Sequence, residues 1–220
     1  TSVISFLTII MWPLVIIVQL ITKLLSRDDD EATVSRDEVT AMANIGLEEG
    51  VIDSDENKVI QNIMKLDKVQ ACDVMTPRIV AMTAQENMTL KNFYKNDAYL
   101  HFSRIPVYAD SPEYITGYIL LSDALEGLAD DEFDKRLVEL KRPISFFKEE
   151  DSCGHIWEEL LKKHEQIALI IDEYGCFQGI LTLGDIIETI LGLEIIDEND
   201  QAIDMQQFAR ERWERRQKRF

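Results

Sequence analysis

The chain has 220 residues and a formal net charge of −18 at pH 7. This length is enough for one or two domains with a hydrophobic core. The acidic excess argues against nucleic acid as a partner, because Lys and Arg side chains are needed to neutralise phosphates. The three cysteines and three histidines are scattered. They show none of the spacings of a zinc site.

Residues 1–25 predict a transmembrane helix that ends a truncated membrane domain. The first 22 residues carry no charge, and roughly 20 apolar residues span a bilayer as a helix. A signal peptide is a weaker alternative, since a basic start and a cleavage site are missing. A buried soluble helix is weaker still, because the apolar segment is so long. Pro13 removes one backbone hydrogen bond from this helix. It indicates either that neighbouring membrane helices cover the gap, or that a lone anchor helix tolerates the proline. Lys23 and Arg27 place the remainder in the cytoplasm.

Residues 26–68 predict a small acidic helical bundle. Between residues 28 and 67 there are twelve Asp or Glu residues and three Lys or Arg residues. Ser35 and Glu38 have the spacing of a capping box at the start of one helix, and a second helix begins near Asp53. This pair of helices could couple a membrane span to the next domain, hold a cation between carboxylates, or form a solvated spacer.

The next part of the chain contains an internal duplication. Residues 115–123 read ITGYILLSD, and residues 177–185 read FQGILTLGD. Residues 104–108 match residues 166–170 at the same offset of 62. A constant offset over separate strands indicates a duplicated structural unit.

Each copy predicts the order β-α-β-β-α, so we expect an α/β (α+β) fold. The first copy covers residues 69–130, with an early strand at residues 79–82, and the second covers residues 131–195. Two such copies usually pack about a pseudo-two-fold axis. The clefts between them are the natural place for a ligand.

Residues 196–220 predict a short basic amphipathic helix. Residues 203–220 contain six Lys or Arg residues and three acidic residues. Such a helix could contact anionic lipid or pack on the acidic helices of its own chain. The complementary charge favours packing on its own chain.

These motifs resemble a known family. The duplication, with GILTLGDIIE at residues 179–188, resembles a tandem pair of cystathionine-β-synthase (CBS) domains, called a Bateman module. DVMTPR at residues 73–78 and HFSRIPVY at residues 101–108 are similar to segments of the CNNM/CorC (cyclin M-like) magnesium transporters, some of which carry the older label "hemolysin". The order of membrane helix, acidic bundle and CBS pair is also similar. The chain differs in having Gly184 where Glu is common, and in stopping after a short basic helix.

The resemblance implies a site for an adenine nucleotide between the copies. It implies eight nucleotide-binding residues: Thr76, Pro77, Phe102, Ser103, Arg104, Pro106, Thr182 and Asp185. Thr76 and Pro77 would lie beside the base and Phe102 would stack on it. Mg²⁺ would arrive with ATP and bridge its phosphates.

The polar members of this set have chemistry that suits the rest of the nucleotide. Asp185 could accept hydrogen bonds from both ribose hydroxyls, with Thr182 aimed at the same cleft, while Ser103 and Arg104 could donate to phosphates. From the residues alone, Thr182 and Asp185 could instead cap a helix. Arg104 could be a surface ion pair, and Phe102 could belong to the core.

The two copies differ at these positions. Leu120 matches Thr182, and Gln166 matches Arg104. We therefore predict one nucleotide per chain, and a poor or empty counterpart cleft.

The resemblance implies a regulatory cytosolic module of a transporter for Mg²⁺ or other divalent cations in the plasma (inner) membrane. It would dimerise through its CBS pairs, and Mg-ATP would act by binding two states with different affinity. No nucleophile–base pair or Walker loop is present in the sequence, so we do not expect an enzyme. One alternative is a membrane-anchored nucleotide sensor that transports nothing. Another is a membrane-damaging toxin, for which the sequence contains no export signal.

Overall fold

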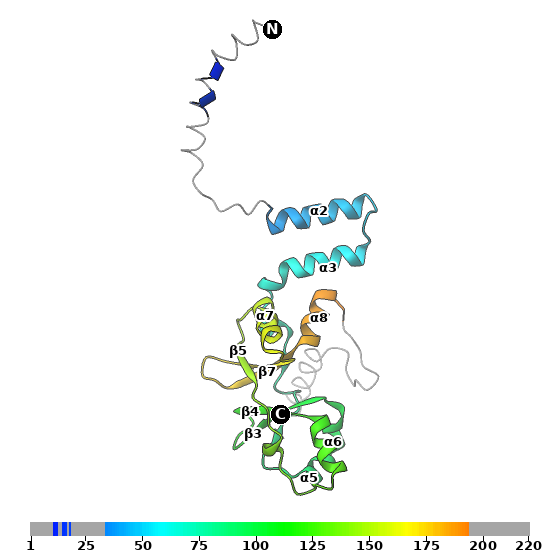
Figure 1. Ribbon diagram of the computed structural model, residues 1–220, viewed down its shortest axis with the longest axis vertical. Helices are drawn as coiled ribbons and strands as arrows, with labels where there is room; N and C mark the ends of the chain where they lie inside the picture. The colour runs from blue at the N-terminus through cyan, green and yellow to red at the C-terminus, as the bar shows by residue number, and fades with distance from the viewer. Residues whose placement is uncertain (1–10, 13–14, 17, 19–33, 194–220) are drawn as a thin grey trace, which may run out of the picture. The chain divides into compact units, whose positions relative to one another are not determined.

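The structure is a computed structural model that describes residues 11–12, 15–16, 18 and 34–193 (Figure 1). The chain divides into two compact units, residues 1–42 and 43–220. The predicted transmembrane segment lies largely outside the described residues, and the predicted C-terminal helix lies entirely outside them. Among the described residues, none of the helices has the length and apolar character needed to cross a membrane.

The two acidic helices begin where the sequence predicts. The helix α2 (Arg36–Glu48) is capped by Ser35, whose Oγ accepts a hydrogen bond from the Glu38 N–H at 3.2 Å. The Ser35 N–H in turn donates to the Glu38 carboxylate at 2.8 Å. The helix α3 (Ser54–Lys65) has a second capping box, made by Asp53 and Glu56. Each capping box therefore satisfies free N–H groups at the start of its helix.

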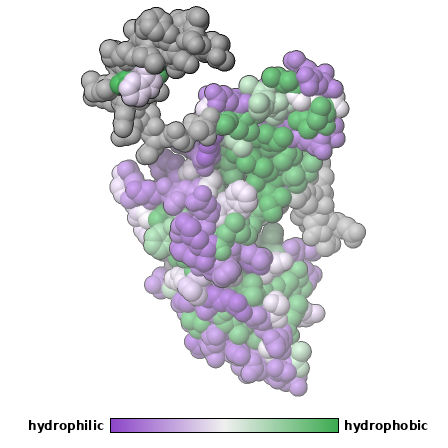
Figure 2. All heavy atoms as spheres, turned by 45° about the horizontal axis from the view of Figure 1, so that its top comes forward, coloured by the Kyte–Doolittle hydropathy of each residue, from purple (hydrophilic) through white to green (hydrophobic). Residues whose placement is uncertain are grey.

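Polar and apolar side chains both mark this helical region within the second unit. Asn57 of α3 is buried and donates to the Asn44 side chain at 3.2 Å, and Gln61 donates to the same oxygen at 2.9 Å. Ile45 and Val51 remain 53% and 75% exposed. Figure 2 shows hydrophobic surface next to strongly polar surface on the face that it presents.

The order β-α-β-β-α is confirmed in both copies. The first copy consists of β2 (Ala84–Gln85), α5 (Leu90–Tyr94), β3 (Arg104–Tyr108), β4 (Ile115–Leu120) and α6 (Leu121–Ala129). The second consists of β5 (Ser145–Lys148), α7 (Cys153–Lys163), β6 (Ile167–Ile171), β7 (Phe177–Thr182) and α8 (Leu183–Leu191). The linking segments contain η1 (Leu66–Lys68), α4 (Ala71–Val74), β1 (Thr76–Pro77), η2 (Asp97–His101) and η3 (Leu137–Glu139).

Each copy has its own sheet and its own core. The first sheet has the strand order β2-β3-β4, and the second has the order β1-β7-β6-β5. In both, the first strand of the copy runs parallel to the second, and the second runs antiparallel to the third. Ile105 and Ile119 lie in one hydrophobic cluster, while Ile170 and Leu181 lie in another. The duplication is therefore structural as well as sequential.

The copies exchange their lead-in segments. The strand β1 lies before β2 of the first copy in the chain but pairs with β7 of the second copy, with Thr76 opposite Ile180. Arg142 lies before β5 of the second copy but forms a bridge with Tyr118 of β4 in the first copy. Tyr118 and Ile180 are counterparts at the offset of 62, so the two crossings are equivalent.

Two glycines allow these crossings. A Cβ atom on Gly179 would lie 2.6 Å from the Thr76 carbonyl oxygen, and one on Gly117 would lie 2.4 Å from the Arg142 carbonyl oxygen. Neither distance is compatible with a side chain. These glycines are themselves counterparts, which explains why both copies have Gly at this position.

The strand predicted at residues 79–82 is wrong, because these residues form a turn. The N–H groups of Val80 and Ala81 both donate to the Pro77 carbonyl at 3.0 Å. Thr76 and Arg142 are equivalent lead-in residues, and Ala84 and Phe146 are equivalent positions in the first strand of each copy. The first copy therefore runs from Thr76 to Ala84, and the second from Arg142 to Phe146. These spans are eight and four residues, so the turn occupies an insertion of four residues in the first copy.

Candidate functional site

A cavity of about 360 Å³ lies where the two copies meet. This size is within the range of small-molecule sites in proteins. The lining residues come from the lead-in turn, from the starts of β3, β6 and α8, and from β1 and β7. They are Thr76, Val80, Ala81, Met82, Phe102, Ser103, Arg104, Gln166, Ile167, Ile180, Thr182, Leu183 and Gly184.

The structure brings most of the predicted site residues together. Five of the eight line the cavity: Thr76, Phe102, Ser103, Arg104 and Thr182. Pro77 lies in β1 opposite Gly179, and Pro106 is buried in β3 opposite Tyr118. Asp185 follows the lining residue Gly184 at the start of α8.

Thr182 and Asp185 form a capping box at the first turn of α8. The Thr182 N–H and hydroxyl donate to one Asp185 carboxylate oxygen at 2.6 and 2.9 Å, and the Asp185 N–H donates to the Thr182 hydroxyl at 3.3 Å. These two residues therefore cap α8, which is one of the two alternatives that the sequence left open. The same bonds hold the carboxylate next to the cavity wall, because Thr182 lines the cavity.

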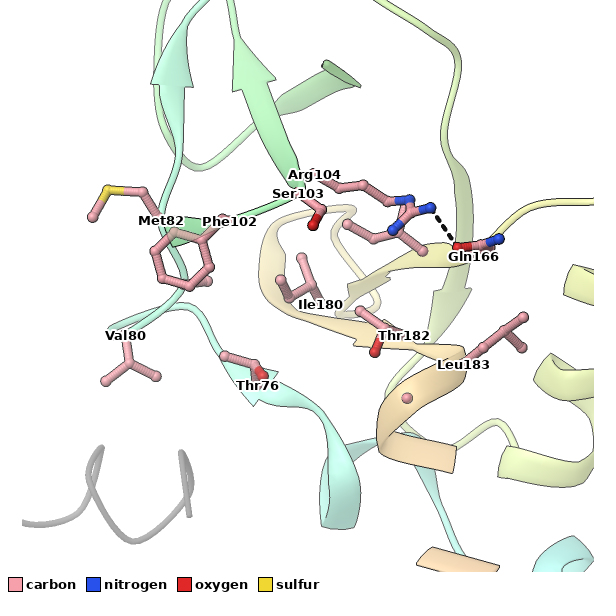
Figure 3. A pocket seen from close by; sticks show the side chains of 13 residues that line it. Thr76, Val80, Met82, Phe102, Ser103, Arg104, Gln166, Ile180, Thr182 and Leu183 are labelled. Carbon is pink, nitrogen blue, oxygen red and sulfur yellow. Dashed lines mark hydrogen bonds between the residues drawn. The ribbon is translucent and has the colours of Figure 1, made fainter. Parts of the chain in front are cut away.

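The cavity has an apolar end and a polar end. Figure 3 shows Phe102 beside Met82 on one side and Arg104 beside Gln166 on the other, with Ser103 between them. Thr76 and Thr182 lie below Ser103 in this view. A ligand with a flat apolar part and an anionic part would match this arrangement, since aromatic rings stack and guanidinium groups bind oxyanions.

Arg104 is held in place across the pseudo-two-fold axis. Its Nη2 donates a hydrogen bond to the Gln166 side-chain oxygen, drawn as a dashed line in Figure 3. The two residues are counterparts at the offset of 62. The hydroxyl of Tyr114 and the sulfur of Cys176, another counterpart pair, lie 3.8 Å apart. Equivalent residues meet only near a two-fold axis, so these pairs locate it.

The counterpart positions in the other half have a different chemistry. Arg142 stands at the lead-in position that Thr76 occupies in the cavity. It donates from Nη2 and Nε to one oxygen of Asp123, at 2.8 and 3.2 Å. Leu120 replaces the Thr182 hydroxyl. A carboxylate that matches Asp185 is thus already bound by a cation from its own chain.

The buried thiol near Asp185 has a strongly perturbed pKa. Burial, followed by the charges of Asp73 and Asp185, raises the pKa of the Cys153 thiol to about 12. Desolvation disfavours the thiolate, and nearby carboxylates disfavour it further. The thiol therefore stays protonated at neutral pH and packs as part of the core of the second copy.

Several lining residues were not predicted from the sequence. Val80, Ala81 and Met82 were predicted in a strand, and Gln166 was noted only as the counterpart of Arg104. The offset of 62 contained a usable signal for Gln166. Two counterpart residues that lie near the axis approach the same site. A predicted site residue at the end of a strand therefore indicates that its counterpart also lies in the site.

Comparison with known proteins identifies the class of this chain. The CBS domain family matches residues 137–192, which correspond to the second copy. The chain resembles the CBS domain of a bacterial CNNM/CorC family Mg²⁺ transporter, with a TM-score of 0.70, 28% identity and coverage of 74% of this chain and 99% of that one. The ATP complex of such a domain matches with a TM-score of 0.59 and 27% identity, over 62% of this chain and 97% of the other. Residues 137–192 therefore match the CBS domain family, and the chain has the fold of CNNM/CorC CBS domains.

Its curated relatives narrow the assignment. It is 32% identical over 209 residues to the UPF0053 protein sll1254 of Synechocystis, covering 95% of this chain and 60% of the relative. It is 28% identical over 181 residues to the magnesium and cobalt efflux protein CorC of Escherichia coli K12, covering 81% of this chain and 62% of the relative. The chain therefore belongs among the homologues of the CorC and UPF0053 proteins, and it spans about three fifths of their length.

Proposed function

We propose that this chain is the regulatory module of a CNNM/CorC-type transporter of Mg²⁺ or other divalent cations. In this proposal the cavity binds an adenine nucleotide, and the bound state is passed to a membrane domain. The observation that carries the proposal is the cavity itself, with an aromatic ring at one end, an arginine at the other and hydroxyl groups between.

The cavity chemistry matches the parts of ATP. Phe102 and Met82 would contact the base, with Thr76 and Pro77 alongside, while Pro106 supports the strand that presents Arg104. Arg104 and Ser103 would bind phosphate oxygens. Thr182 and Asp185 would contact the ribose. A related CBS domain, 27% identical to this chain, has been solved with ATP, which supports the nucleotide class.

Mg²⁺ would enter with the phosphates. The protein has a net charge of −18, so free ATP would meet unfavourable electrostatics. A divalent cation that bridges the phosphates reduces this cost and keeps several waters as ligands. Among the described residues, no group of three or more acidic, histidine or cysteine side chains could hold a metal by itself.

Coupling to a membrane would run through the helical region. The last turn of α8 contacts α3, where the Lys58 ammonium donates to the Gly192 carbonyl at 2.6 Å and the Asn62 amide donates to the Ile190 carbonyl at 3.0 Å. The first turn of α8 carries Thr182 and Asp185. We propose that α8 connects the cavity to α3, with the module in the cytoplasm at the plasma membrane as a homodimer of CBS pairs.

The experiment is calorimetry on the full chain in detergent, because the first 22 residues are uncharged. ATP, ADP, AMP and adenosine are titrated with and without Mg²⁺. We expect saturable binding of ATP, strengthened by Mg²⁺ and weakened by Asp185→Ala. Glu56→Ala is the control, since it removes the same member of a capping box at α3, remote from the cavity. Equal ATP affinity in Asp185→Ala and the unchanged chain would count against the site.

Transport is tested separately from binding. Flux of Mg²⁺ is compared in cells that carry the full-length gene with and without Asp185→Ala. A change in flux supports the transporter module. Flux that is independent of both the gene and the variant supports the alternative of a membrane-anchored nucleotide sensor.

A further inference from the structure

We propose that Gln166 is a positioning residue that holds the Arg104 guanidinium over the cavity without neutralising it, and so favours nucleotides with phosphate groups over the nucleoside. This inference rests on the proposed nucleotide function. It concerns a residue that the sequence analysis left outside the site.

The pair lies at the pseudo-two-fold axis. Arg104 and Gln166 both line the cavity and are joined by a hydrogen bond across the axis. Because they are counterparts, a strictly repeated sequence would place two guanidinium groups against each other. Like charges this close repel. A glutamine in the second copy replaces that repulsion with an acceptor for the arginine.

The acceptor in this pair, the Gln166 side-chain oxygen, belongs to an uncharged group. An amide oxygen accepts one of the five N–H donors of arginine and leaves its positive charge in place. In the described part of the chain, no carboxylate forms an ion pair with Arg104. Arg142, at the counterpart site, has the opposite arrangement and is paired with Asp123 at 2.8 Å. One cation is committed within the chain, and the other is oriented yet available to a ligand.

The hydrogen bond to Gln166 also orders the long Arg104 side chain. A free arginine loses rotamer freedom when it binds a phosphate, which costs affinity. A partner that already holds the guanidinium at the cavity reduces this loss. Gln166 lies at the polar end of the cavity, beside Arg104 and away from Phe102 (Figure 3). Its effect should therefore fall on the phosphates and not on the base.

The test uses Gln166→Glu and Gln166→Leu in the full chain in detergent, titrated with Mg-ATP and with adenosine. The carboxylate that Gln166→Glu introduces would form an ion pair with Arg104, so ATP should bind at least about tenfold more weakly, as expected when a charge-assisted hydrogen bond is lost. The apolar side chain in Gln166→Leu would leave the arginine unheld and weaken ATP about two- to tenfold through the ordering cost. Adenosine binding should stay unchanged in both variants.

A double-mutant cycle with Arg104→Met separates positioning from a structural role. In the Arg104→Met background, Gln166→Leu should change ATP affinity less than about threefold, because the group that Gln166 positions is missing. Gln61→Glu is the matched control, since it adds the same charge on α3 and should leave ATP affinity unchanged. The cycle needs only the ATP titrations.

The outcomes are distinct. Weaker ATP binding in Gln166→Glu, together with a loss in Gln166→Leu that disappears in the Arg104→Met background, supports the inference. Unchanged ATP affinity in both single variants, or an equal loss for Gln166→Leu in both backgrounds, overturns it while leaving the proposed function intact. Absence of ATP binding by the unchanged chain overturns the proposed function and this inference together.

Discussion

The two crossing glycines offer a matched pair of perturbations. In Gly179→Ala the new Cβ would lie 2.6 Å from the Thr76 carbonyl oxygen, and ordinary contact begins at 3.4 Å, so β1 must move by 3.4 − 2.6 = 0.8 Å. In Gly117→Ala the distance to the Arg142 carbonyl oxygen is 2.4 Å, and the same reasoning gives 3.4 − 2.4 = 1.0 Å. Both clashes involve backbone atoms, which cannot be relieved by a change of rotamer.

The expected destabilisation is similar for the two variants. Overpacking of this kind costs about 1–3 kcal/mol, which lowers the melting temperature of a domain of this size by roughly 2–12 °C. The consequences for the cavity differ, because Thr76 lines it and Arg142 does not. We expect Gly179→Ala to weaken ATP about tenfold, equivalent to about 1.4 kcal/mol, and Gly117→Ala to leave ATP affinity unchanged.

The assay combines thermal unfolding with calorimetric titration of Mg-ATP below the melting temperature of both variants. Unfolding shows whether the two clashes are equally severe, and titration shows whether only one reaches the ligand. Equal loss of ATP affinity in both variants would refute the assignment of the site to one side of the axis. Unchanged stability in both would refute the geometry of the crossings.

Three further predictions use single contacts. Arg142→Met should lower the free energy of unfolding by at most about 1 kcal/mol, because the side chain is 49% exposed and exposed ion pairs contribute little; urea unfolding measures this, and a loss of ATP affinity would contradict it. Hydrogen bonds from Lys141 and then Thr116 hold the pKa of Glu86 below its usual value, so their stabilisation is present above the unfolded-state pKa and is lost as the pH falls through the folded-state pKa. The stability difference between Lys141→Met and the unchanged chain should therefore shrink below about pH 4, whereas a constant difference would argue against the pair. Lys58→Met removes the donor to the carbonyl at the end of α8 and should speed amide hydrogen exchange there; unchanged exchange would show that the contact is unimportant.

Much of the fold follows from patterns in the sequence. The order β-α-β-β-α was predicted for both copies and is observed, with strands at Arg104–Tyr108 and Ile167–Ile171, because runs of β-branched and apolar residues favour a buried strand. The capping box at Ser35 predicted one helix start, since such a side chain satisfies a free N–H group, and a second helix was predicted to begin near Asp53. The duplication in the sequence also predicted that the two sheets are equivalent.

The rest depends on packing that no local pattern records. Residues 79–82 have the composition of a strand, yet they turn back on Pro77, because β1 is taken by the sheet of the other copy. Val80, Ala81 and Met82 of this turn line the cavity. Gln166 has no distinctive neighbours in the sequence. Its contact with Arg104 exists because two copies meet at an axis, which is a property of the assembled pair.

A duplicated unit provides two equivalent sites unless the copies diverge, and here the divergences gather around one cavity. The four-residue insertion, the Thr182 hydroxyl and the amide-held Arg104 all favour that side, whereas Arg142 and Asp123 neutralise each other on the other side. In a protein with a net charge of −18, an anionic ligand binds only where a cation remains available. The stoichiometry of Mg-ATP should therefore be one per chain, and two sites of equal affinity would show that these differences do not select between the halves.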